Sequence, residues 1–271
     1  MKKLVCFAFA AALLAAPPAL AQREDSLQGC AHASGDMQIK ACTWLIHDGK
    51  QKDADLAVSF LNRGVAYQIQ GKFPQAAFDY TQAFTLVPNF ALAYVDLGSL
   101  YDADGQYERA ISYYDKALVA RPDFTLGYFA RARANAELGR HEQALADYDK
   151  YDALVPNDAE LFNNRGDSYL ALGRLDVALA DFNHALQLNP AFSEALQNRS
   201  VANFRGANYA ASIADASAVL SHQPRNTAAL YVRGVARLKT GDATGGKADI
   251  AAATAIDAKI APAFAAQGVA P

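Results

Sequence analysis

The stretch that decides the fold runs from Ala159 to Pro190 and reads AELFNNRGDSYLALGRLDVALADFNHALQLNP. Gly173 divides it into two segments of helical length, and Pro190 ends the second segment. Apolar and small side chains recur in both segments at the spacing of one helix face. They are Phe162, Gly166, Tyr169 and Leu170 in the first segment and Leu175, Ala178, Leu179, Phe182 and Ala185 in the second. The stretch therefore predicts two antiparallel helices joined by a turn.

This arrangement returns along the chain every 34 residues. Prolines mark the period at Pro88, Pro122, Pro156, Pro190 and Pro224. Glycines mark it at Gly71, Gly105, Gly139, Gly173 and Gly241, with Ala207 in the remaining place. A fixed period of this length is typical of repeat proteins, in which each unit buries its apolar face against its neighbours. We therefore expect a series of stacked helix pairs.

The composition is that of a folded chain. Of its 271 residues, 52% are hydrophobic and 20% are charged, which excludes global disorder. The formal net charge is -3, so the chain has no general attraction for phosphate backbones, and we expect no nucleic-acid partner. The three cysteines are too few for a fold built on disulfides or for a four-cysteine zinc site.

Residues 1–21 are predicted to be a secretory signal peptide. Lys2 and Lys3 precede an apolar run over residues 4–16, and Ala-Leu-Ala at residues 19–21 supplies a cleavage signature. An uncleaved membrane anchor is the alternative, but the run is shorter than the roughly 20 residues that cross a bilayer. We expect an exported protein without a membrane span in the mature chain. The periplasm is the preferred location, and secretion to the medium is the alternative.

Two columns of small residues also follow the period. They are Gly64, Gly98, Ala132, Gly166, Ser200 and Gly234 in the first helices, and Ala76, Ala110, Ala144, Ala178, Ser212 and Gly246 in the second helices. These columns closely resemble positions 8 and 20 of the tetratricopeptide repeat family, where paired helices approach most closely. The resemblance covers six repeats: 57–90, 91–124, 125–158, 159–192, 193–226 and 227–260. It implies an all-α, right-handed superhelical solenoid of helix-turn-helix repeats.

Large residues fill the other signature columns of the family. They include Phe60, Tyr94, Tyr128 and Phe162 at position 4, Tyr67, Tyr101 and Tyr169 at position 11, and Tyr80, Tyr114, Tyr148 and Phe182 at position 24. We interpret this aromatic stripe as core and not as a ligand site. Departures gather late in the chain, at Asn203, Ala216, Arg237 and Ala243. We therefore expect repeats five and six to pack less well and to unfold first.

A polar pair occurs in five of the six repeats, with arginine at position 7 and aspartate at position 23. Both are absent from repeat two, where Leu97 and Tyr113 stand. Because contacts between repeats would leave Asp79 and Arg131 unpaired, we predict structural ion pairs within each repeat. A row of arginines for an anionic ligand is the alternative, but a guanidinium held by a carboxylate is a poor ligand site. The pairs are Arg63–Asp79, Arg131–Asp147, Arg165–Asp181, Arg199–Asp215 and Arg233–Asp249.

Residues 22–56 are expected to form an N-terminal capping half-repeat. On the frame that the resemblance supplies, Cys30 and Cys42 fall in the two small-residue columns that touch. We therefore predict a disulfide between them, and a helix from about Asp36 to Asp48. A redox switch or two free thiols is the alternative.

Residues 261–271 are expected to form a C-terminal cap and tail. Ala261, Phe264 and Gly268 match positions 1, 4 and 8 of a seventh repeat that stops short. Residues 268–271 are expected to fray.

The resemblance also implies a concave face lined by the first helices, on which this family commonly binds extended peptides or partner helices. Its lining positions here are rich in side-chain amides, which can both donate to and accept from a peptide backbone. The predicted partner-binding groove consists of Asn62, Phe129, Arg133, Asn163, Asn164, Asp167, Gln197, Asn198, Arg205 and Tyr231.

A non-enzymatic scaffold that holds a protein or peptide partner is therefore the expected function. Two alternatives stay open: an envelope complex subunit that assembles through its outer face or repeat edges, and a binding protein for a small ligand or glycan. We expect no catalytic residue, metal or cofactor. Residues 241–247 have the spacing of a phosphate-binding loop, but Ala248 stands where its Ser or Thr would follow. The sequence leaves the partner's identity and the oligomeric state open.

Overall fold

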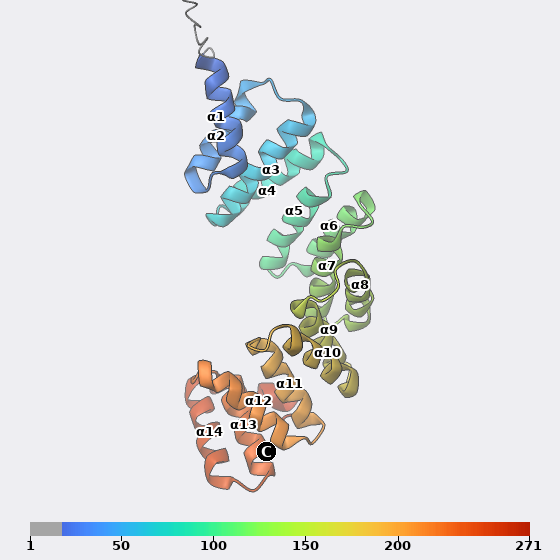
Figure 1. The fold of residues 1–271 in the computed structure, drawn as a ribbon, viewed down its shortest axis with the longest axis vertical. Helices are drawn as coiled ribbons and strands as arrows, with labels where there is room; N and C mark the ends of the chain where they lie inside the picture. Colours follow the sequence, from blue (N-terminus) through green and yellow to red (C-terminus); the bar gives the residue numbers. More distant parts are fainter. Residues whose placement is uncertain (1–17) are drawn as a thin grey trace, which may run out of the picture. The chain divides into compact units, whose positions relative to one another are not determined.

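The computed structural model describes residues 18–271, and every regular element in that range is an α-helix. Most of the predicted signal peptide, residues 1–17, lies outside the described residues. The chain divides into two compact units, one ending at Leu100 and the other beginning at Tyr101. Within each unit, helices that follow one another pack as antiparallel pairs (Figure 1). The predicted all-α series of helix pairs is confirmed.

The first unit contains α1 (Pro18–His32), α2 (Gly35–Asp48), α3 (Asp53–Ile69) and α4 (Phe73–Leu86), and α5 (Ala91–Ala103) begins in it. The second unit contains the end of α5 and the remaining helices. These are α6 (Tyr107–Ala120), α7 (Thr125–Glu137), α8 (His141–Leu154), α9 (Ala159–Ala171), α10 (Leu175–Leu188), α11 (Ser193–Arg205), α12 (Tyr209–His222), α13 (Thr227–Lys239), α14 (Ala243–Ile256) and α15 (Ile260–Ala266). Helices α5, α7, α9, α11 and α13 begin at the residues expected to open repeats two to six, whereas α3 begins at Asp53, before the expected Ala57.

The turn inside each repeat needs a left-handed backbone. Gly71 and Gly173 have φ angles of 72° and 74°, a region that glycine enters without steric cost. Ala207, which replaces glycine in repeat five, adopts the same conformation with φ of 59°. A left-handed conformation costs a residue with a Cβ about 1–2 kcal/mol, so this turn is strained while the others are relaxed.

The small-residue columns lie where the helices of a pair touch. A Cβ atom added to Gly64 would lie 2.7 Å from the Tyr80 ring, and one added to Gly166 would lie 2.8 Å from the Phe182 ring. Both distances are shorter than real carbon contacts, so a larger residue would push the helices apart. The aromatic rings at position 24 therefore fill the space that the small residues leave, and Tyr80, Tyr114 and Phe182 are fully buried.

The five arginine–aspartate contacts run within the repeats. In each, the arginine Nε and Nη2 donate to the two oxygens of one carboxylate at 2.6–3.0 Å. The aspartates are buried, and a two-bond geometry between planar groups is the strongest arrangement of such a pair. Repeat two has Leu97 buried instead, and Tyr113 stacks on Tyr101 with ring centroids 5.4 Å apart.

The remaining arginine nitrogen, Nη1, contacts the preceding helix pair. Arg131 donates to Asp115 at 2.5 Å, Arg165 donates to Asp149 at 3.0 Å, and Arg199 donates to Asn183 at 2.7 Å. These arginines therefore join neighbouring repeats as well as the two helices of one repeat. The sequence analysis did not predict this second role.

The late departures from the repeat pattern are not simple losses of packing. Asn203 is buried and donates to Asp215 at 3.1 Å, and Arg237 donates to Asp249 at 2.7 Å. Each adds a third donor to an ion pair. A continuous buried cluster also runs through repeats four to six as far as Val269, so the expectation of poorer packing is wrong at these two positions.

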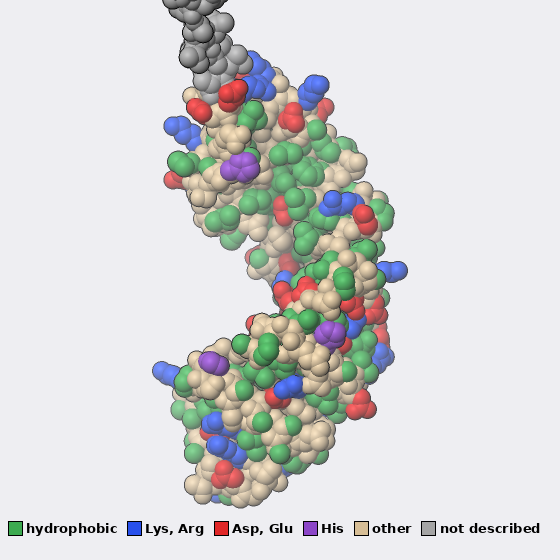
Figure 2. Space-filling view, viewed as in Figure 1, with side chains coloured by type: hydrophobic (Ala, Val, Ile, Leu, Met, Phe, Trp, Pro, Cys, Tyr) green, Lys and Arg blue, Asp and Glu red, His purple; other side chains and the backbone are tan. Residues whose placement is uncertain are grey.

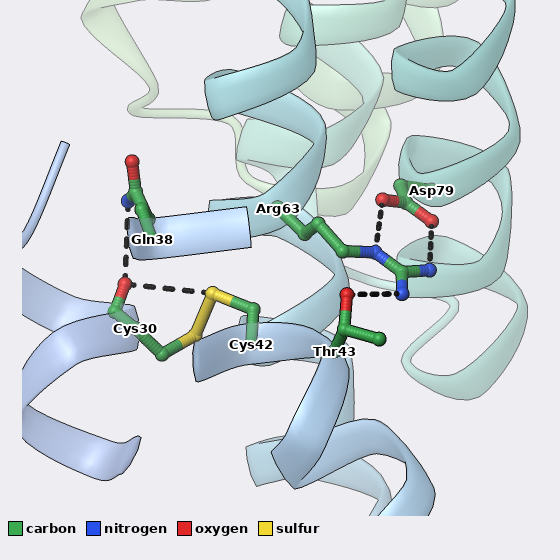
Figure 3. The surroundings of a disulfide bond; sticks show 6 residues. All are labelled: Cys30, Gln38, Cys42, Thr43, Arg63 and Asp79. Carbon is green, nitrogen blue, oxygen red and sulfur yellow. Dashed lines mark hydrogen bonds and ion pairs between the residues drawn. A yellow bond between two sulfur atoms is a disulfide. The ribbon is translucent and has the colours of Figure 1, made fainter. Parts of the chain in front are cut away.

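The N-terminal region contains two helices where the sequence analysis expected one. Helix α2 lies close to the predicted bounds, and α1 packs against it. Cys30 of α1 and Cys42 of α2 form a disulfide with a Cα–Cα distance of 4.7 Å, next to Thr43, to which Arg63 donates (Figure 3). Both cysteines are buried with Leu45. The predicted disulfide therefore joins the two helices of a full pair.

Candidate functional site

A concavity on the second unit lies among the first helices of repeats four to six. It is a cavity of about 850 Å³. Helix α9 contributes Asp167, Leu170 and Ala171, and helix α11 contributes most of the polar wall. Four predicted groove residues line it: Asp167, Gln197, Asn198 and Arg205.

Side-chain amides form a short ladder beside this cavity. Asn198 on α11 donates through Nδ2 to Oδ1 of Asn163 on α9 at 3.1 Å, and Asn163 donates to Asn164 at 3.1 Å. Asn163 is buried, while Asn164 and Asn198 are half-buried. The ladder fixes the orientation of these amides and links two neighbouring repeats. The exposed parts of Asn164 and Asn198 can therefore present a donor and an acceptor to an extended backbone without further ordering.

Arg205 supplies the positive charge of the cavity. Its Nη1 donates to the carbonyl oxygen of Leu170 at 2.7 Å, near the C-terminus of α9, where a cation is favoured by the helix dipole. A guanidinium has five N–H donors, and this is the one acceptor that the structure records for Arg205 in residues 18–271. The remaining donors are available for a carboxylate or a backbone carbonyl of a bound peptide.

Asp167 supplies the negative charge. Its side chain is exposed, yet it lies in a hollow whose walls displace water. This desolvation raises the pKa of Asp167; His141 opposes the rise and Glu137 adds to it. The cavity thus carries one cation and one anion on neighbouring first helices, which suits a polar peptide better than a ligand of single charge.

The other predicted groove residues lie elsewhere. Asn62 is half-buried on α3 of the first unit. Phe129 packs against Tyr151 with ring centroids 5.0 Å apart, and Arg133 is exposed on α7. Tyr231 is 1% exposed and lies 5.6 Å from the ring of Phe264. Tyr231 is therefore a core residue in this structure, whereas Phe129 is half-buried.

The cavity has a wall that the sequence analysis missed. Phe264, Ala266, Gln267 and Gly268, from α15 and the residues after it, line one side. In the 34-residue register these residues belong to a seventh repeat, so their place on the concave face was not predicted.

Neither a metal centre nor a membrane span emerges in residues 18–271. No group of three or more His, Cys, Asp or Glu side chains there is arranged to hold a metal ion. No helix in the same range is long and apolar enough to cross a membrane. Residues 241–247 form the turn before α14 and its first helical turns, where the Asp242 side chain accepts a hydrogen bond from the Gly245 backbone.

The fold and the concave cavity define a helical repeat protein of the binding type. The family profiles described as Tetratricopeptide repeat match residues 61–123, 95–159 and 159–192. Residues 61–192 are therefore tetratricopeptide repeats, as the sequence resemblance predicted. None of the curated proteins compared with the chain matches it.

Solved structures of the same fold cover most of the chain. A tetratricopeptide repeat protein from Parabacteroides merdae is 18% identical, with a TM-score of 0.66 over 88% of this chain and 93% of that one. The pilF protein of Pseudomonas aeruginosa is 16% identical, with a TM-score of 0.67 over 76% of this chain and 94% of that one. YrrB, described as a tetratricopeptide repeat protein with an unusual peptide-binding site, is 20% identical, with a TM-score of 0.56 over 66% and 92%. At these identities the likeness concerns the fold.

Proposed function

We propose that the protein is an exported, non-enzymatic scaffold that holds a peptide segment of a partner protein on the concave face of repeats four to six. The observation that carries the proposal is the cavity of about 850 Å³ between α9, α11 and the C-terminal segment. Its wall combines ordered amides with one charge of each sign, as an extended peptide requires. The peptide-binding site named for the similar YrrB structure is consistent with this proposal.

The test is affinity capture from a cell-envelope extract with residues 22–271. The parent chain is compared with a variant carrying Asn164→Ala and Asn198→Ala, which removes the two half-buried amides. Asn208→Ala, at an exposed amide in the turn between α11 and α12, is the matched control. We expect one partner to be retained by the parent and the control and lost by the double variant. Retention of the same partner by all three chains would contradict the use of this face.

A second candidate function is assembly through the outer surface, and one observation favours it. Hydrophobic side chains gather over α3 and α4 on the face shown in Figure 2. Phe73 and Phe78 of α4 are 52% and 58% exposed, and Phe78 borders a small depression with Arg63 and Tyr67. Exposed apolar patches often mark protein interfaces. If this surface is used, Phe78→Ser abolishes capture and the amide variant does not.

Binding of a small ligand or glycan has less support. That alternative depended on aromatic rings in the groove, and Tyr231 is buried beneath Phe264. Export itself is proposed from the signal sequence, and the disulfide between Cys30 and Cys42 supports it because such bonds persist in oxidising compartments.

A further inference from the structure

The C-terminal segment does not continue the repeat series. In repeats two and four, the aromatic residue at position 4 stacks on a second helix. Tyr94 of α5 stacks on Phe84 of α4 with ring centroids 4.5 Å apart, and Phe162 of α9 stacks on His184 of α10 with ring centroids 4.0 Å apart. Phe264 occupies the corresponding place in the sequence, but its ring lies 5.6 Å from Tyr231, on the first helix of repeat six. Tyr231 is at position 5, which belongs to the concave face. The segment has therefore turned onto that face.

The end of the segment reaches still further back. At position 8 of a complete repeat, the small residue meets its own second helix, as Gly166 meets Phe182. A Cβ atom on Gly268 would instead lie 3.8 Å from the side chain of Arg205 on α11. Gly268 has a φ of 80°, and the Val269 N–H donates to the Phe264 carbonyl at 2.9 Å. This turn directs Val269 inward, where it is fully buried, so the predicted fraying is wrong at Val269.

The burial of position 9 shows what the segment covers. Along the series, this concave position is half-buried at Val65 and exposed at Arg133 and Asp167. In repeats five and six the same position is 5% exposed at Val201 and 0% exposed at Val235. Both valines belong to one buried cluster with Ile260, Phe264 and Val269. Position 9 is therefore open at Arg133 and Asp167, whereas in repeats five and six it is covered by residues 260–269.

We infer that residues 260–269 are a built-in ligand of the concave face, and that a partner binds by displacing them. This inference rests on the proposed function. The site fits a partner segment that resembles the chain's own. Such a segment has an aromatic side chain, then one helical turn, and an aliphatic side chain five residues after the aromatic one, as in Phe264 and Val269. Such a segment would place its aromatic ring against Tyr231 and its polar backbone toward Gln197, Asn198 and Arg205. The tethered segment competes at the effective concentration set by its short connection to α14.

The test uses a fluorescent synthetic peptide of residues 258–271 as the probe and residues 22–271 as the receptor. A receptor carrying Phe264→Ala and Val269→Ala keeps its C-terminus but loses the two anchoring side chains. We expect it to bind the probe at least about tenfold more tightly than the parent, because its own segment no longer competes. A peptide with the same two substitutions is the control and should not bind. Equal affinity of the two receptors, or equal binding of the two peptides, would overturn the inference.

A second variant tests the inference even if the doubly substituted receptor fails to fold. Pro271→Cys places an environment-sensitive dye on the exposed last residue of an otherwise unchanged chain. Excess unlabelled peptide 258–271 should change its fluorescence in a saturable manner, and the substituted peptide should not. No response would mean that the segment is a fixed cap. This outcome leaves the capture test with the amide variant untouched, so the two proposals fail separately.

Discussion

The two ends of the helix series are closed in different ways. At the N-terminal end, a covalent bond between Cys30 and Cys42 joins α1 to α2, and the helices are those of a full pair. At the C-terminal end, a single short helix turns onto the concave face, and Phe264 and Val269 are buried in an apolar cluster with no covalent bond to it.

The difference between the ends has a functional consequence. The disulfide holds α1 against α2 whatever binds elsewhere on the protein. This closure depends only on the redox state of the compartment. Apolar contacts close the other end reversibly, at a site where a partner can compete for the same surface. The disulfide therefore stabilises the N-terminal end permanently, whereas the C-terminal segment can be replaced by a partner.

The largest expected effect concerns a buried ion pair in the repeats that lie between the two ends. Arg165→Leu leaves Asp181 buried without a partner, and also removes contacts to Asp149 and Asp152 of the preceding repeat. We expect a loss of about 3–5 kcal/mol in the free energy of unfolding. Chemical denaturation followed by circular dichroism measures it.

The control for this prediction is the double variant Arg165→Leu, Asp181→Tyr, which copies the residue types of repeat two. It should recover part of the lost stability because no charge is left buried. Arg174→Leu breaks an ion pair between exposed side chains and should cost about 1 kcal/mol or less. Absence of recovery in the double variant would contradict the pairing within repeats.

Removal of the disulfide should have the next largest effect. Replacing Cys30 and Cys42 by serine is expected to cost about 3 kcal/mol, the value for a closed loop of this length. The loss should be confined to α1 and α2, because contacts between repeats are local. Urea unfolding of the variant and of the reduced parent chain should give matching curves. A shift in the urea midpoint of the C-terminal repeats as well would contradict the independence of the two ends.

A pH dependence is expected within the first unit. Burial raises the pKa of Asp96, on α5, to about 7, and the structure records no hydrogen bond to its carboxylate in the described range. Because the pKa of an aspartate in the unfolded chain is near 4, the folded state binds the extra proton, and stability should fall as the pH rises from about 4 to 7.

Asp96→Asn removes this ionisation and tests its sign. The variant should gain melting temperature relative to the parent at pH 8, and the gain should shrink at pH 5. Asp123→Asn, at an exposed loop position, is the matched control for removing a carboxylate. A gain from Asp96→Asn that is the same at both pH values would rule out titration of this carboxyl group.

The smallest effect concerns the strained turn of repeat five. Ala207→Gly relieves the left-handed conformation of Ala207 but adds freedom to the unfolded chain, so we expect a net gain of about 0.5–1 kcal/mol. Thermal unfolding measures the gain. Gly173→Ala is the reciprocal change in the preceding repeat and should destabilise the protein. A destabilising Ala207→Gly would mean that this turn is not under strain.

The helix pairs could be predicted from the sequence because they follow from local periodicity. The spacing of Gly and Pro fixes the turns, and small residues such as Gly64 and Gly166 show where the helices touch. The C-terminal wall could not be predicted in this way. Phe264 fits the pattern of a seventh repeat, and its place is decided by a contact with Tyr231 that no period encodes.

The polar part of the site was partly predictable for the same reason. Gln197 and Asn198 lie at lining positions of the repeat, and the structure brings them to the cavity with Asp167 and Arg205. The repeat pattern alone predicts a loss of core packing at Asn203 and Arg237, because it does not encode their hydrogen bonds to Asp215 and Asp249.

Hydrogen exchange at both ends of one chain tests the central claim most directly. The account predicts that reductant accelerates exchange in α1 and α2 alone. It also predicts that residues 260–269 exchange by a local opening that is faster than the opening of α11 and α13 and is indifferent to reductant. Exchange of residues 260–269 at the rate of α13, under both conditions, would show that the segment opens only when the last repeats unfold and would contradict the account.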